Sequence, residues 1–176
     1  WHLGGKVSRV NATMRTLGAE IEVEDTTVAT IEYESGAIGT LESTTAARPD
    51  DFEASISFVC SEGLAQIGGI AVNELQIFTP DPVACTGYSE DFVGIEGHGA
   101  VYGYGHSAMY ADIVGALASD DPYPVDHEDC RDTLRLLHAF YRSDEAGDWV
   151  EVDDDAESFR LGRADDAVSK IYRTPA

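Results

Sequence analysis

Hydrophobic and polar residues alternate along much of the first 80 residues of the chain. The clearest segment is 9–15, in which Val10, Ala12 and Met14 alternate with charged or polar residues. A period of two is typical of a strand with one face against a core and the other in water. The pattern therefore predicts strands rather than helices for this half of the chain.

Short turns separate the predicted strands and indicate how the strands pair. A segment rich in β-branched residues ends at Ser35-Gly36, and a second strand ends at Ser61-Glu62-Gly63; both turns predict hairpins. Strands joined by tight turns are antiparallel, because parallel pairing needs a long crossover. We therefore expect an open antiparallel sheet of about five or six strands. The predicted strands are 9–15, 26–34, 37–45, 54–60, 64–67 and 74–79.

Helical spacing replaces alternation in the second half of the chain. Apolar residues between 109 and 117 form one stripe, and a second helix is expected to begin at Asp126, which can form a capping box with Asp129, and to end near Gly147. Residues 149–152 can add an edge strand, and residues 81–105 are predicted to be an irregular, glycine-rich loop. The expected core face of the second helix comprises Cys130, Leu134, Leu137 and Tyr141.

Strands followed by helices indicate an α+β fold, an open and mostly antiparallel sheet with helices packed on one face. The opposite face is then wet or covered by another subunit. We expect one domain over residues 1–152 and an acidic tail over 153–176.

Charge narrows the class of protein. Acidic residues number 33 against 11 basic ones, for a net charge of −22, and only two of the basic residues are lysines. Self-repulsion of this size is relieved when salt screens it, so the composition favours a protein from a salt-rich cytoplasm. An acidic interaction surface is the alternative. With no basic patch, nucleic acid is not an expected partner.

Length and leader signals point to a cytoplasmic fragment. The sequence has no apolar run long enough to span a membrane and no signal peptide pattern, and it begins without methionine. We expect a piece cut from a longer protein. The three cysteines, Cys60, Cys85 and Cys130, fit no metal motif, and Cys60 and Cys130 are expected to be buried thiols.

Candidate chemistry is sparse. No glycine-rich turn follows a predicted parallel strand and opens a helix, so no dinucleotide cradle is expected here. His98 and His106 lack a recognisable third metal ligand, and no metal site is predicted. His106 stands at the expected start of a helix, where free amides favour anions and hydroxyls, or it simply turns the chain. Arg48 can pair with a sugar acid or with a carboxylate of the chain itself.

Several short motifs, in this order and spacing, resemble the C-terminal domain of the Gfo/Idh/MocA oxidoreductases. The resemblance covers roughly residues 1–152 and implies part of an NAD- or NADP-dependent sugar dehydrogenase. The matching motifs are Trp-His-Leu-Gly-Gly-Lys-Val at 1–7, Asp-Thr-Thr-Val-Ala at 25–29, Gly-Ala-Ile-Gly at 36–39, Ser-Glu-Gly at 61–63, Gly-His with Tyr110, Ile113 and Ala116 at 105–116, Pro-Val-Asp at 124–126, and Leu137 with Ala-Phe-Tyr-Arg-Ser at 139–143.

Within that family, segments 67–73 and 101–106 look most like dehydrogenases acting on C3 of UDP-N-acetylglucosamine-type sugars, including the uronate. This implies substrate contacts by Asn73, Tyr104 and His106, to which we add Arg48. The family's cofactor-binding and catalytic motifs belong upstream of Trp1, in a Rossmann domain, so none maps here. The expected partners are that domain, a sugar or nucleotide-sugar, and further copies of the chain bound through the open sheet face. The alternative is a non-catalytic binding or dimerisation module.

Overall fold

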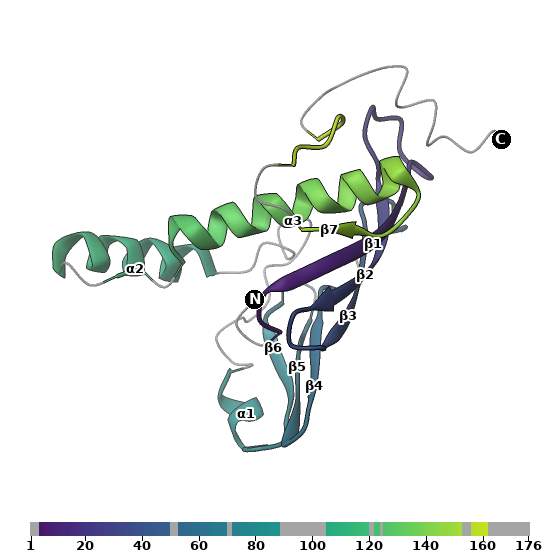
Figure 1. Ribbon diagram of the computed structural model, residues 1–176. Coiled ribbons are helices and arrows are strands. Elements are labelled where there is room, and N and C mark those ends of the chain that lie inside the picture. Colours follow the sequence, from purple (N-terminus) through teal and green to yellow (C-terminus); the bar gives the residue numbers. More distant parts are fainter. Residues whose placement is uncertain are drawn as a thin grey trace. The chain divides into compact units, whose positions relative to one another are not determined.

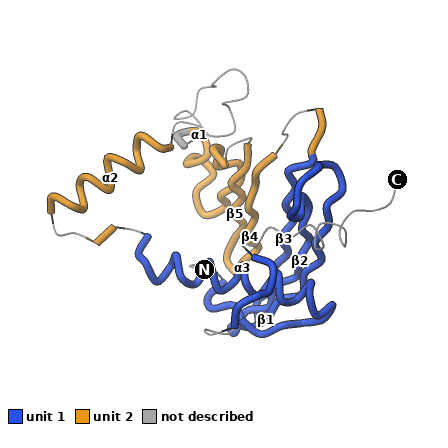
Figure 2. Tube along the Cα trace, turned by 90° about the horizontal axis from the view of Figure 1, so that it is seen from above, with its two compact units in different colours: residues 1–46, 125–176 blue, residues 47–124 orange. Residues whose placement is uncertain are grey.

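A computed structural model describes most of the chain, and its residues form two compact units that are taken separately (Figure 2). Unit 1 contains residues 1–46 and 125–176, and unit 2 contains residues 47–124. The described residues are 4–49, 53–69, 72–88, 105–119, 122–123, 125–152 and 156–161. The elements, in order, are β1 (Val7–Arg15), β2 (Thr26–Tyr33), β3 (Ile38–Thr44), β4 (Ile56–Cys60), β5 (Gly63–Gly68), β6 (Glu74–Phe78), α1 (Ala84–Tyr88), α2 (Gly105–Ser119), α3 (His127–Ala146) and β7 (Val150–Glu151).

Unit 1 is an antiparallel sheet in the order β3-β2-β1-β7, with α3 lying along β1 (Figure 1). The predicted alternation is confirmed, since the apolar residues of β1 are buried while Arg9, Thr13 and Arg15 are exposed. The α+β class with a helix on one face of the sheet is therefore confirmed. The core consists of Val7, Val10, Ala12, Met14, Ala29, Ile31, Ala139, Phe140 and Tyr141.

The edge of β1 is completed by side chains of α3 rather than by a full strand. β7 is only two residues long, and the next edge amides of β1 find acceptors on the helix. The Ala12 N–H donates to Ser143 Oγ at 2.9 Å, and the Met14 N–H donates to Asp144 Oδ1 at 2.9 Å. Ser143 in turn donates to the Asp148 carbonyl at 2.7 Å. Helix and strand are thus joined by hydrogen bonds as well as by apolar packing.

Both ends of α3 follow the sequence signals. Asp126 accepts the N–H groups of Glu128 and Asp129, and the Asp129 carboxylate accepts the Asp126 N–H, which completes the predicted capping box. At the other end Gly147 adopts φ 66°, a left-handed conformation that glycine accepts without strain. This turn sends the chain back along the sheet as β7.

The predicted core face of α3 is right for only one of its four residues. Tyr141 is buried, but Leu134 is 54% exposed, Leu137 is 39% exposed, and Cys130 is exposed. The buried residues of α3 all lie between 139 and 143, although a helix of 20 residues is about 30 Å long. Its first half therefore has no described layer to pack against.

Unit 2 contains a second antiparallel sheet, in the order β4-β5-β6, with α1 against β6. Both predicted hairpins are present, but the strands are divided between two sheets instead of forming one. Short helix α1 lies within the segment predicted to be irregular. Cys60 is exposed rather than buried, and none of the residues of α2 is buried. None of the described helices is long and apolar enough to cross a membrane.

Asp25 organises the loop between β1 and β2. Asp25 is 3% exposed. Its carboxylate accepts hydrogen bonds from the N–H groups of Leu17, Gly18 and Ala19 and from the Thr26 hydroxyl. Burial alone would raise the pKa of this carboxyl, but the hydrogen bonds outweigh burial and lower the pKa from 3.8 to about 2. The charged form is therefore part of the folded loop.

We expect Asp25→Asn to lower the free energy of unfolding at neutral pH by roughly 2 kcal/mol, because an amide offers one acceptor oxygen where the carboxylate offers two. The folded-state pKa is depressed, so the contribution of Asp25 is present above pH 3.8 and is lost as the pH falls towards about 2. Denaturation between pH 7 and pH 2 measures both effects. Glu22→Gln, on the same loop and exposed, is the control. An unchanged acid limb in Asp25→Asn would contradict this account.

Ser143→Ala tests the junction between α3 and β1. Ser143 has 0% exposure, so its removal leaves the Ala12 N–H without its acceptor in a buried position. We expect a loss of about 1–3 kcal/mol in the free energy of unfolding, measured by chemical denaturation. Thr133→Ala removes an exposed hydroxyl from the same helix and should change stability far less. Equal effects of the two substitutions would argue against a junction at Ser143.

Candidate functional site

Arg48 lies on the loop that follows β3, and its side chain is exposed. Its Nη1 donates to the Ala47 carbonyl at 2.6 Å. This contact turns the guanidinium back towards the chain's own backbone. A guanidinium is suited in general to bidentate pairing with a carboxylate or phosphate. A role in binding an acidic sugar remains a prediction.

Asn73 lies immediately before β6 and is partly buried. Its Oδ1 approaches Gly69 so closely that a Cβ placed on that glycine would stand 2.5 Å away. Gly69 also has φ +89°, which disfavours any other residue there. The absence of a side chain at Gly69 therefore leaves room for the Asn73 amide, which is a group that can donate to and accept from sugar hydroxyls.

His106 is the second residue of α2 and is exposed. The helix begins where the sequence predicted, and its first turn contains no acidic residue. The free N–H groups and the positive end of the helix dipole therefore surround His106 without a carboxylate of that turn to compensate them. Tyr104 lies outside the described residues.

The predicted residues come from three different elements of unit 2. Arg48 contacts the neighbouring Ala47, Asn73 lies against Gly69, and His106 lies in the first turn of α2. Their convergence on one ligand is therefore a prediction. His98 lies outside the described residues, and among those that are described no group of three or more histidine, cysteine or acidic side chains can hold a metal ion.

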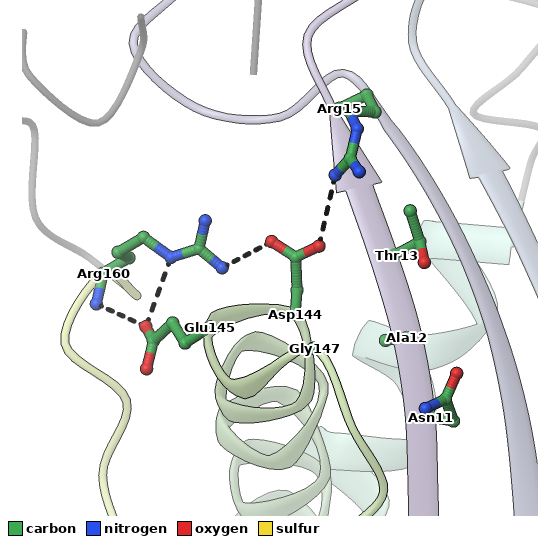
Figure 3. A pocket seen from close by; sticks show the side chains of 8 residues that line it. All are labelled: Asn11, Ala12, Thr13, Arg15, Asp144, Glu145, Gly147 and Arg160. Carbon is green, nitrogen blue, oxygen red and sulfur yellow. Dashed lines mark hydrogen bonds and ion pairs between the residues drawn. The ribbon is translucent and has the colours of Figure 1, made fainter. Parts of the chain in front are cut away.

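Unit 1 contains a hollow that the sequence did not indicate (Figure 3). Its volume is about 470 Å³. It lies between the second half of β1 and the end of α3, and Arg160, from the segment that the sequence predicts to be an acidic tail, also lines it. The lining residues are Asn11, Ala12, Thr13, Arg15, Asp144, Glu145, Gly147 and Arg160.

Ion pairs cross this hollow and account for its charged lining. Arg160 Nη2 lies 2.8 Å from Asp144 Oδ2, and its Nε lies 3.2 Å from Glu145 Oε1. Arg15 Nη1 lies 3.4 Å from the other Asp144 oxygen. Because each charge faces an opposite one, the lining supports structure rather than proton transfer. The sequence places two acidic residues at the end of a helix, where they need a cation. It does not indicate which basic residue supplies that cation.

The described strands do not fit a nicotinamide cofactor. That group needs a parallel βαβ unit with a glycine-rich turn at a helix N-terminus. Every strand pairing among the described residues is antiparallel.

Comparison with known proteins identifies relatives of the fold. Residues 1–66 match the GFO/IDH/MocA C-terminal domain. The WlbA dehydrogenase from Bordetella pertussis, solved with NADH and UDP-GlcNAcA, is 30% identical with a TM-score of 0.71, over 84% of this chain and 42% of that one. The WlbA dehydrogenase from Chromobacterium violaceum, solved with the same two ligands, is 27% identical with a TM-score of 0.67, over 86% of this chain and 42% of that one.

A more distant likeness shows the fold alone. Levoglucosan dehydrogenase, solved with NADH and L-sorbose, is 20% identical with a TM-score of 0.58, over 84% of this chain and 45% of that one. Among curated proteins no match was found. The chain spans less than half the length of the structures that it matches. The resemblance predicted from the sequence is confirmed: in sequence over residues 1–66, and in fold over most of its length, this chain is similar to the C-terminal domain of the Gfo/Idh/MocA oxidoreductases.

Proposed function

We propose that this chain is the C-terminal domain of an NAD(P)-dependent sugar dehydrogenase that acts on a nucleotide-sugar. The observation that carries the proposal is the 30% identity, over 84% of the chain, to a dehydrogenase solved with NADH and UDP-GlcNAcA. Under this proposal a Rossmann domain upstream binds the cofactor and supplies the catalytic base. This chain forms one wall of the sugar site and part of a subunit interface.

The role left to these residues is orientation. The Asn73 amide, which lies against Gly69, and His106, in the first turn of α2, would bind sugar hydroxyls, together with Tyr104, two residues before His106. Arg48 would pair with the uronate carboxylate or a phosphate. Holding the sugar so that one carbinol carbon faces the nicotinamide removes translational and rotational freedom before the reaction, which is a large part of catalysis.

The open face of the unit 1 sheet is the proposed contact with further copies of the chain. It presents polar side chains in register across the strands, including Asn11 opposite Thr30 and Arg9 opposite Glu32. The Arg9 Nε lies 2.7 Å from Glu32 Oε2. Threonine and paired charges suit a wet interface that forms hydrogen bonds. A cytoplasmic location is part of the same proposal.

The decisive experiment uses the parent protein that contains this chain and whatever precedes it. NADH fluorescence titration tests cofactor binding, and reduction of NAD⁺ or NADP⁺ in the presence of UDP-GlcNAcA tests the reaction. We expect both. A parent protein that binds neither cofactor, with an upstream sequence that has no βαβ pattern, would favour the non-catalytic binding or dimerisation module instead.

His106→Ala in the parent enzyme should raise the KM for the nucleotide-sugar about fivefold or more, because loss of one hydrogen bond to substrate costs about 1–3 kcal/mol. NADH affinity should stay unchanged. His127→Ala removes another exposed histidine near a helix start and is the matched control. Equal KM values for His106→Ala and the unsubstituted enzyme would remove His106 from the proposed site.

Salt dependence tests the proposed adaptation to a salt-rich cytoplasm. With a net charge of −22, the free energy of unfolding should rise between about 0.1 M and 2 M KCl, as screening shortens the Debye length. Denaturation at each salt concentration measures the slope. A variant with several exposed acids of the 20–24 and 128–132 segments changed to amides should show a smaller slope. A flat dependence in both proteins would favour the alternative, an acidic interaction surface.

A further inference from the structure

Residues 156–161 lie against the last turns of α3 as an ordered segment. Ser158 is buried, and its N–H donates to His138 Nδ1 at 3.1 Å. The Phe159 N–H donates to Glu145 Oε1 at 3.0 Å. The segment is therefore attached to the helix at two points that lie two turns apart.

Arg160 provides the third attachment and the nearer of two cations that pair with Asp144 at this helix end, the other being Arg15. Its side chain is 10% exposed, and it contacts both Asp144 and Glu145. Its Nη2 also donates to the Tyr141 carbonyl at 3.3 Å. The last turn of α3 has no basic residue, and carboxylates there face the negative end of the helix dipole. Arg160 offsets a repulsion that the helix itself cannot relieve.

The same carboxylate that holds Arg160 also completes the edge of β1. Asp144 Oδ2 faces Arg160 at 2.8 Å, while Asp144 Oδ1 accepts the Met14 N–H at 2.9 Å. The Asp144 side chain is 8% exposed. Without Arg160 this carboxylate would keep only the more distant Arg15 as a cation, which would favour turning outward to water. Turning outward would take the acceptor away from Met14.

We propose that residues 156–161 are a strap whose docking on α3 and the completion of the β1 edge are one coupled event. Arg160 is the link, acting through Asp144. Release of the strap frees the Met14 N–H and removes the partner of Arg15, which stands at the border of the open sheet face. The strap thereby connects the segment after β7 to the face proposed for subunit contact. The coupling itself concerns the fold alone and does not depend on the proposed enzymatic function.

Amide hydrogen exchange of the full chain tests the coupling. In Arg160→Gln, the amides of both Phe159 and Met14 should exchange about tenfold faster or more, because the loss of a buried charge partner frees both attachments. The Ile31 amide, in the central strand β2, is the internal reference and should change little. Arg142→Gln is the matched control, since Arg142 lies on the same helix and contacts the Glu151 carbonyl.

Two further variants separate the coupling from general stability. Asp144→Asn should speed exchange at Phe159, whose N–H is bonded to Glu145 and not to residue 144. Arg160→Lys keeps a charge and should fall between the unsubstituted chain and Arg160→Gln. Faster exchange at Phe159 with no change at Met14 would overturn the proposal. So would equal acceleration at Phe159, Met14 and Ile31 in both Arg160 variants.

Discussion

The fold of unit 1 depends on how the unpaired edge of β1 is satisfied. A buried N–H without an acceptor lowers the free energy of unfolding by an amount that is large compared with the small net stability of a domain. These amides therefore need hydrogen-bond partners. β7 is too short to supply them all, and Ser143 and Asp144 of α3 accept the remaining ones. Because these bonds fix the end of α3 along β1, they also bring the apolar residues 139–141 onto the core.

In so acidic a chain, few basic side chains are available to pair with buried carboxylates. Only 11 basic residues stand against 33 acidic ones, yet Arg160 lies where two partly buried carboxylates meet at a helix end. Asp25 shows the other solution, in which backbone N–H groups rather than a cation hold the charge. Among the described residues, no buried side-chain nitrogen or oxygen lacks a hydrogen-bond partner. Surface acids can be tolerated through salt, whereas buried acids need a specific local partner.

The features that could be predicted from the sequence are those set by local patterns of hydrophobic, capping and turn residues. Alternation identified β1 and both hairpins, Asp126 and Gly147 marked the ends of α3, and α2 begins next to His106 as expected. Periodicity states which face of a helix is apolar, not whether anything covers it, so Leu134 was wrongly expected in the core. The pairing of Arg160 with Asp144 joins residues on different segments and has no sequence signature. Convergence of the candidate sugar-binding residues is non-local in the same way.

The antiparallel pairing of the strands limits which ligands they can bind. Antiparallel meanders place loops at both ends of each sheet and bury no glycine-rich turn at a helix start, so they can orient a ligand but not cradle a pyrophosphate. A chain that spans 42% of a dehydrogenase solved with NADH and UDP-GlcNAcA is expected to perform the first task and leave the second to residues elsewhere. The proposed role of Asn73 follows from this separation of sugar binding from cofactor binding. Its amide lies against Gly69 in the absence of any cofactor, so under the proposed function this contact to the sugar is in place before the cofactor binds.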